Sequence, residues 1–381
     1  MTSVPFFQWR GSPIRVGFDV QALAESGYEV DLLTIPVGED RSIPGVTVHR
    51  VWNPMRIKSM PIGPSFGKAL FDILLLFAAV TLAFRRRYAV IHAVEELGII
   101  AWFIARLVGA KVVFEKHSDP ESHRDRPLKN LVLSAYRRLE AVSIRLADSV
   151  IATGEGLEEQ ARAVAPEQKV YHIFDIPSSL VDSDPARVLA VRAKLKQAPD
   201  EVVALYVGSF AVYQGIDLLF ESFALALKSK PSLRLVVVGG KPYEIAARRA
   251  WLEEREIAGR VTFLGFVAPD KLPNYTAAAD ILVSSRISGI NTPLKLLDYM
   301  KAGRAILATN NEANRKLVDE RCALLAPATP EGFAAGFVEL AADEERREIL
   351  GRAGRQRVEE VYNFAEFKKL LKDCYDGVLA E

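Results

Sequence analysis

The feature that most constrains the fold is a regular alternation of short apolar runs with longer amphipathic stretches. In the first half of the chain, runs rich in β-branched residues lie at 30–35, 89–92, 111–115 and 149–153. The stretches with helical spacing between them lie at 15–26, 68–84, 97–107 and 128–147. Continuous buried strands that alternate with helices indicate a parallel sheet covered by helices on both faces.

The second half repeats this alternation. Its apolar runs lie at 202–207, 233–238, 261–264, 281–284 and 305–308, with stretches of helical spacing between them. The segment 175–186 contains two prolines and several Ser and Asp residues, which favours a linker. A chain of 381 residues suits two domains better than one. We therefore predict an α/β protein of two doubly wound domains, over residues 1–177 and 178–364, that face each other across a cleft.

Composition excludes several classes of protein. The net charge of +1 provides no general field for nucleic acid, so no nucleic-acid partner is expected. The two cysteines, Cys322 and Cys374, are far apart in the sequence, which favours reduced thiols. The histidines show no metal-binding spacing, and no metal ion is expected. Residues 1–10 lack the pattern of a signal peptide, and we expect a cytoplasmic protein.

The start of the chain departs from the doubly wound pattern. A glycine turn at Gly11 and Ser12 precedes a helix, as it would after a first strand, but residues 1–7 make a poor strand. A doubly wound sheet places its first strand near the centre. We therefore hypothesise that the native chain begins upstream of Met1.

The most apolar stretch, 69–84, contains Asp72 and is closed by Arg85, Arg86 and Arg87. It is expected to be too short to span a bilayer. One interpretation is a helix packed on a sheet. The other is a helix end that rests on an anionic membrane surface through the three arginines, at the inner face of the membrane.

The strongest signal for chemistry is the segment 284–303. A strand ends at Ser284, a polar loop with a glycine follows, and Pro293 opens a helix that ends at Gly303. A loop that leads into a helix N-terminus presents free N–H groups and a positive dipole end, as in phosphate sites of α/β folds. Asp298 lies on this helix and could accept hydrogen bonds from ribose hydroxyls. The alternative is an ordinary strand–helix unit with a solvated Asp298.

A second polar region follows the strands of the first half. His117 lies in a polar loop that extends to Asp119, at the carboxyl end of a strand, where α/β folds place their sites. The alternative is a hydrogen-bonded structural histidine. Glu95 and Glu96 follow another strand, and they either orient an acceptor hydroxyl or cap the helix that begins at Leu97. We favour capping.

The segment 284–303 resembles glycosyltransferase family 4, whose members are retaining enzymes of GT-B architecture. Asp298 falls on the second acid of the family's E-x7-E signature, and Gly303 falls on its closing glycine. Further segments agree in order along nearly the whole chain. They are the N-terminal glycine loop at Gly11, the active-site histidine at His117, the stretches 206–209 and 215–219, and the base-binding loop 265–267 with Leu272 and Tyr275.

This sequence departs from the family pattern at three charged positions. The first acid falls on Ile290, and the arginine and lysine that neutralise the donor diphosphate fall on Ser209 and Gln214. In one interpretation, Arg286 and Lys295 supply the charge from the same loop region. In the other, the protein is a non-catalytic relative.

The resemblance implies a retaining transfer of a sugar from a nucleotide-diphosphate donor to a glycan or lipid-linked acceptor, without cofactor or metal. The catalytic residues would be His117, Lys295 and Arg286. The acceptor side would hold Gly11, Ser12, Glu95 and Glu96, and the last helix, 365–381, would cross back to the N-terminal domain. A nucleotide-sugar epimerase is the enzymatic alternative. The residues expected to bind the donor are Gly208, Ser209, Gln214, Val267, Leu272, Gly289, Ile290, Asn291, Thr292, Pro293, Leu294 and Asp298.

Overall fold

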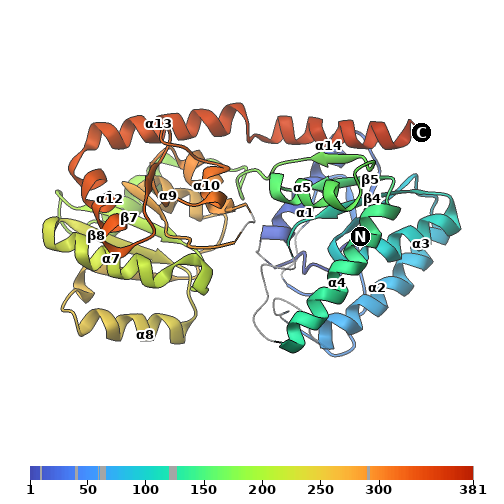
Figure 1. Cartoon of the computed structure of the whole chain (residues 1–381), viewed down its shortest axis with the longest axis horizontal. Helices are drawn as coiled ribbons and strands as arrows, with labels where there is room; N and C mark the ends of the chain where they lie inside the picture. Colours follow the sequence, from blue (N-terminus) through green and yellow to red (C-terminus); the bar gives the residue numbers. More distant parts are fainter. Residues whose placement is uncertain are drawn as a thin grey trace. The chain divides into compact units, whose positions relative to one another are not determined.

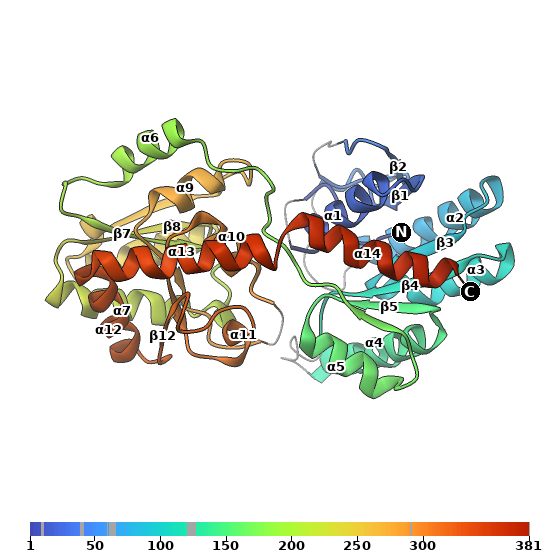
Figure 2. The same ribbon diagram turned by 90° about the horizontal axis from the view of Figure 1, so that it is seen from above.

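The computed structural model describes residues 1–8, 11–38, 42–58, 60, 66–119, 127–289 and 292–380. The chain forms two compact units (Figures 1 and 2). Unit 1 comprises Met1–Asp175 and Phe364–Glu381, and unit 2 comprises Ile176–Asn363. The last helix therefore belongs to the first unit, although it follows the second in the sequence.

Unit 1 contains two parallel sheets. The larger has the order β3 (Val90–Val94), β4 (Lys111–Lys116), β5 (Ser149–Ala152) and β6 (Val170–His172). The smaller pairs β1 (Val30–Thr34) with β2 (Val46–Arg50). The helices of this unit are α1 (Gly11–Glu25), α2 (Phe66–Arg85), α3 (Gly98–Val108), α4 (Pro127–Leu146), α5 (Glu155–Val164) and α14 (Phe364–Leu379). Helix α14 packs against α1 (Figure 2).

Unit 2 contains one parallel sheet of six strands, in the order β12-β11-β10-β7-β8-β9. The strands are β7 (Val202–Val207), β8 (Leu233–Val238), β9 (Val261–Gly265), β10 (Ile281–Ser284), β11 (Ala305–Thr309) and β12 (Leu324–Ala326). The helices are α6 (Pro185–Leu195), α7 (Ile216–Ser229), α8 (Pro242–Glu253), α9 (Leu272–Ala278), α10 (Leu294–Ala302), α11 (Glu312–Arg315), α12 (Pro330–Ala342) and α13 (Glu344–Glu360).

Alternate residues of the central strands bury opposite faces of this sheet. In β7, Ala204 and Tyr206 join a core with residues of α7 and α12, while Val203 and Leu205 join a second core with residues of α10. All six residues of β8 are buried. The sheet is thus covered on both faces, and this confirms the predicted α/β class. The cysteines Cys322 and Cys374 are both free and buried.

The strand order reverses between β7 and β10. From β7 the chain proceeds outward through β8 and β9, whereas from β10 it proceeds in the other direction through β11 and β12. Ligands of doubly wound sheets bind beyond the carboxyl ends of the strands at such a switch point. The loops that follow β7 and β10 therefore define where a site should lie in unit 2.

Helix α2 is longer than the apolar stretch from which it was predicted. It has 20 residues, and Gly67–Arg85 is long and apolar enough, by length and composition alone, to cross a membrane. The expectation that this stretch is too short was therefore wrong, because the helix extends beyond the apolar run at both ends. One face packs into the core of unit 1 through Phe71 and Leu75. On the other, Ile73, Phe77 and Phe84 are exposed.

Candidate functional site

Two cations lie where the loops after β7 and β10 meet. Arg286 follows β10 and is only 6% exposed, and its Nε donates a hydrogen bond to the Ser288 carbonyl at 2.8 Å. Lys295 lies in the first turn of α10. Its Nζ donates to Gln214 Oε1 at 2.6 Å and lies 4.4 Å from the centre of the Tyr206 ring. The structure therefore brings together Gln214 and Lys295, which are 81 residues apart in the sequence.

The electrostatic state of these two cations is unusual. Burial, and then repulsion by Arg286, lowers the pKa of Lys295 to about 7. Burial also lowers the pKa of Arg286. Within the described ranges neither side chain forms an ion pair with a carboxylate; their polar partners are a carbonyl and an amide oxygen. Two half-buried or buried cations without an acidic partner favour the binding of an anion.

Glycine allows the two loops to approach each other. A Cβ on Gly215, whose φ is +66°, would lie 1.9 Å from the Ser285 carbonyl oxygen, and a Cβ on Gly208 would lie 2.9 Å from Lys295 Nζ. Any larger residue at Gly215 would push the loops apart. Hydrogen bonds join the loops, because Ser285 Oγ donates to the Gln214 carbonyl at 2.9 Å. Backbone and side-chain groups of both loops thus surround the two cations.

The other residues expected at this loop are placed as follows. Helix α10 begins at Leu294, after Thr292 and the cap residue Pro293, and Gly303 ends it in the left-handed conformation. Gly289 lies beside the Arg286 guanidinium. Ser209 contributes its carbonyl, which accepts a hydrogen bond from the Tyr206 hydroxyl at 2.8 Å. Ile290 and Asn291 lie outside the described residues.

Asp298 accepts two hydrogen bonds from one residue, Ser178, in the segment that enters unit 2. Its Oδ1 accepts from the Ser178 amide at 2.7 Å, and its Oδ2 accepts from Ser178 Oγ at 2.8 Å. Burial raises the pKa of Asp298 to about 6, although the Ser178 hydrogen bonds oppose this. Asp298 is thus half-buried and hydrogen-bonded rather than fully solvated.

A small cavity of about 40 Å³ lies beside this carboxylate. Lys295, Asp298 and Leu272 line it together with residues of the 178–183 segment. Leu272 and Val267 also pack against the core that contains residues of α10. The structure thus gathers several of the residues expected to bind a donor around α10, in a space that accommodates a few waters at most.

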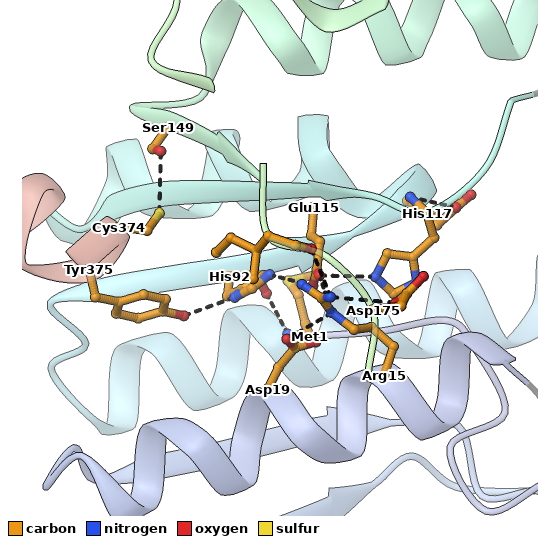
Figure 3. Close-up of polar contacts among 12 residues, drawn as sticks. Met1, Arg15, Asp19, His92, Glu115, His117, Ser149, Asp175, Cys374 and Tyr375 are labelled. Atoms are coloured by element: carbon orange, nitrogen blue, oxygen red, sulfur yellow. Dashed lines mark hydrogen bonds and ion pairs between the residues drawn. The ribbon is translucent and has the colours of Figure 1, made fainter. Parts of the chain in front are cut away.

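Unit 1 contains a buried cluster of charged side chains around His117, the histidine of the second polar region predicted from the sequence (Figure 3). Arg15 donates to Asp19 at 3.1 Å and to Glu115 at 3.0 Å, and it also contacts Asp175 at 3.4 Å. His92 and His117 contact the same Glu115 at 3.1 and 3.3 Å. Arg15 and Glu115 were not predicted from the sequence as site residues, because a charged residue on a helix or strand is usually exposed.

The groups of this cluster shift one another's pKa values, and burial raises the pKa of Asp19 well above its usual value. Burial alone would lower the pKa of His117, but the Glu115 carboxylate raises it to about 9, so the imidazole is a cation at neutral pH. The same contacts hold the pKa of Glu115 well below its usual value despite burial. Asp19, Glu115 and His117 each offer a ligand atom within 4.8 Å of the others. However, Arg15 already donates to both carboxylates, so the arrangement suits an ion network better than a metal site.

Glu95 and Glu96 do not cap the helix, and the preference for capping was wrong. Neither the short 3₁₀ segment Glu95–Leu97 nor α3 has a side-chain cap at its start. Instead, Glu95 accepts hydrogen bonds from the His117 amide at 3.2 Å and from Ser118 Oγ at 3.0 Å, and its other oxygen accepts from Tyr136 at 2.9 Å. Glu96 contacts Ser3 and Lys68.

The backbone of Glu95 has a φ of +59°. Such a conformation is uncommon for a residue with a side chain, and it often marks a functional position. It turns the Glu95 carboxylate towards the loop after β4. Gly11 and Ser12, the other residues expected on the acceptor side, form the first turn of α1.

Two glycosyltransferase family models match the chain, one in each half. The model of the glycosyl transferases of group 1 matches residues 189–357, and the model of the glycosyl transferase 4-like domain matches residues 11–174. The D-inositol 3-phosphate glycosyltransferase of Segniliparus rotundus is 26% identical over 372 residues, covering 87% of this chain and 77% of that protein. YtcC of Bacillus subtilis is 28% identical over 190 residues, so the chain spans only 46% of its length.

Solved structures share the fold. The sucrose-phosphate synthase of Thermosynechococcus elongatus superposes with a TM-score of 0.77 at 23% identity, over 97% of this chain and 94% of that one. At this identity the likeness concerns the fold alone. It extends over both units.

Proposed function

The chain belongs to the group 1 glycosyltransferases and has the GT-B fold, and we propose that it transfers a sugar, with retention, from a nucleotide-diphosphate donor to a glycan or lipid-linked acceptor. The observation that carries the proposal is the pair Arg286 and Lys295. These cations lie at the switch point of unit 2 without a carboxylate partner among the described residues. A diphosphate supplies the missing negative charge.

The chemistry requires little of the protein beyond positioning and charge stabilisation. The bond between the anomeric carbon and the donor phosphate breaks, and the acceptor oxygen forms a bond on the same face of the sugar. The leaving diphosphate takes the acceptor proton, so no strong protein base is needed. Lys295 and Arg286 stabilise the negative charge that grows on the diphosphate, together with N–H groups at the start of α10.

Lys295 and Arg286 can supply the positive charge that the family pattern places at Ser209 and Gln214. Ser209 and Gln214 provide no charge, but Gln214 accepts a hydrogen bond from Lys295 and so orients it. A cation held in this way can replace one that the family usually supplies from the loop after β7. This favours an active enzyme over a non-catalytic relative.

In this proposal Asp298 binds the donor ribose. The carboxylate already accepts two hydrogen bonds, from the amide and the hydroxyl of Ser178. A ribose diol offers two donors of the same kind. The ribose would therefore replace Ser178 on Asp298, and the 178–183 segment would move to enlarge the cavity of about 40 Å³. No metal or other cofactor takes part in this proposal.

We further propose that helix α2 rests on an anionic membrane, where a lipid-linked acceptor would be found. Phe77 is 66% exposed, and Ile73 and Phe84 are exposed on the same helix. Arg85 and Arg87, at the end of the helix and just beyond it, are also exposed. Because the opposite face of α2 packs into the core, the helix would lie on the membrane surface rather than span it.

Hydrolysis of donor in the absence of acceptor tests the proposed reaction. The protein is incubated with UDP-glucose, GDP-mannose and ADP-glucose, and release of each diphosphate is measured. We expect diphosphate release from one donor and loss of that release in Lys295→Ala. The freed sugar, followed by NMR, should appear first as the anomer of retained configuration. The control Lys194→Ala removes an exposed lysine of the same unit and should have no effect. No release from any donor in the panel would favour the non-catalytic alternative, and an inverted product would exclude retention.

A further inference from the structure

Two side chains of α10 hold the segment 178–184, which enters unit 2 before α6. Asp298 accepts its two hydrogen bonds from Ser178, at the start of the segment. Lys301 lies one turn later on the helix, and residues three positions apart are neighbours on a helix surface. A carboxylate and an ammonium on one side of α10 are therefore both available to the segment.

Lys301 contacts the middle of the segment. Its Nζ donates to the Ser179 carbonyl at 2.7 Å and to the Val181 carbonyl at 3.0 Å, and it lies 3.5 Å from Oδ1 of Asp182. Burial lowers the pKa of Lys301, and Asp182 opposes this shift. The ammonium thus exchanges part of its hydration for two backbone carbonyls and one carboxylate of the segment.

Polar contacts, rather than buried apolar side chains, hold the segment in place. It has no regular secondary structure. Its two apolar side chains, Leu180 and Val181, are 40% and 63% exposed. At its far end, the Asp184 amide donates to Asn274 Oδ1 of α9 at 2.8 Å. A segment with so little apolar burial is of the kind that opens locally at a low cost in free energy.

The segment covers the carboxylate that is proposed to bind ribose. Residues of the segment, among them Ser178 and Asp182, line the cavity of about 40 Å³ together with Asp298 and Lys301. A space of this volume holds a few waters at most, not a pentose ring. Both oxygens of Asp298 already accept hydrogen bonds from Ser178. A ribose can therefore reach Asp298 only after the segment has moved.

We propose that the segment 178–184 is a gate over Asp298 and that Lys301 holds it shut. The proposal rests on the function proposed above, in which Asp298 binds the donor ribose. Only the open form then binds a nucleotide, so the observed dissociation constant exceeds the intrinsic one by the inverse of the open fraction. Lys301 thus opposes nucleotide binding, although it is a cation on the same helix as Lys295.

The direction of its effect distinguishes a gate residue from a residue that contacts the donor. Removing a cation that binds the diphosphate, such as Lys295, weakens nucleotide binding. Removing the ammonium of Lys301 releases two carbonyls of the segment, raises the open fraction and strengthens nucleotide binding. Lys301→Met suits the test, because methionine keeps an unbranched apolar stem and removes the charge.

Calorimetric binding of UDP, GDP and ADP to the wild type, Lys301→Met and the control Lys194→Met tests the gate. Lys194 is an exposed lysine of α6. Titration at pH 7.5 keeps Asp298 ionised, since its pKa is about 6. We expect Lys301→Met to bind the preferred diphosphate about tenfold more tightly than the wild type and the control do. Binding by Lys301→Met alone would also support the gate, because the segment would then stay shut in the wild type.

Hydrogen exchange provides a readout that a merely structural lysine would not change. In the free protein, Asp298 protects the Ser178 amide. The bound nucleotide should speed exchange at this amide, because ribose replaces Ser178 on the carboxylate. Lys301→Met should speed the same exchange without nucleotide, while exchange in β8 stays unchanged.

Ser178→Ala provides a second variant, because it removes the hydroxyl that donates to Asp298 and leaves Lys301 in place. It should bind the diphosphate about threefold more tightly, and it decides the question if Lys301→Met does not fold. Equal or weaker binding by Lys301→Met, or unchanged exchange at Ser178 on binding, would overturn the gate and leave the proposed donor site standing. If no diphosphate binds to the wild type or to either variant, the donor site itself is contradicted, and the gate with it.

Discussion

Binding of a nucleoside diphosphate should depend on pH through Lys295. The pKa of this lysine is about 7 in the free protein, since its ammonium is desolvated and faces Arg286. A bound diphosphate would stabilise the ammonium and raise that pKa again. Binding would then take up a proton above pH 7, so affinity must fall as the pH rises.

The size of the effect follows from the lowered pKa. At pH 7 about half of the free protein carries a charged Lys295, and at pH 9 about one part in a hundred does. If the diphosphate returns the pKa to its usual range near 10.5, the dissociation constant should rise roughly 50-fold between pH 7 and pH 9. Tyr206, whose ring faces Lys295, does not titrate in this range, because burial raises its pKa well above the usual value.

Calorimetric titration of the preferred diphosphate at pH 7, 8 and 9 measures this dependence. Repeating it in buffers of different ionisation enthalpy counts the protons taken up. The matched variant is Lys295→Arg, because arginine stays charged throughout and should bind with little pH dependence. An equally steep fall in Lys295→Arg, or no proton uptake in the wild type, would refute the reasoning.

Three further changes have defined outcomes. Gly215→Ala should destabilise unit 2 by about 2 kcal/mol in urea unfolding and weaken nucleotide binding, because its Cβ would meet a carbonyl oxygen at 1.9 Å and its φ is +66°. The control Gly259→Ala has open space around its Cβ and should show little change in the same assay. Arg15→Met should cost about 3–5 kcal/mol in the same assay, because it leaves buried carboxylates unpaired, and a neutral result would show that the ion cluster is dispensable. Phe77→Ser should reduce flotation with anionic vesicles without changing the melting temperature, whereas Leu189→Ser, on an exposed site of unit 2, should float like the wild type; equal flotation of both variants would exclude a membrane role for α2.

The sequence predicted the strands that are continuously apolar. The run that forms β7, Val202–Val207, has no charged residue and its four inner residues are buried, and such runs are hard to mistake. The strands β2, β6 and β12 were missed. They are short or, like Val46–Arg50, largely half-buried with polar side chains, so their pattern does not stand out.

The candidate site was predictable in part for a related reason. The loop after β10 and the cap at Gly303 follow local rules, so the neighbourhood of Arg286 and Lys295 could be located from residue type and spacing. The hydrogen-bond partners of Lys295 and Asp298 could not be predicted in this way. The contact of Lys295 with Gln214 and that of Asp298 with Ser178 join residues 81 and 120 positions apart.

The network around Glu95 shows the same limit. Its role depends on a left-handed backbone conformation and on partners from α4 and from the loop after β4. Two consecutive acids before a helix normally indicate capping, because they favour the helix N-terminus. Tertiary contacts overrode that local preference here.

The most direct test of the central claim is calorimetric binding of UDP, GDP and ADP to the wild type and to Arg286→Ala, Lys295→Ala and the control Lys194→Ala. We expect that one diphosphate binds, that either change at the buried pair weakens binding at least tenfold, and that the control binds as the wild type does. If no diphosphate binds, or if one binds equally well without Arg286 and Lys295, these cations do not form the donor site.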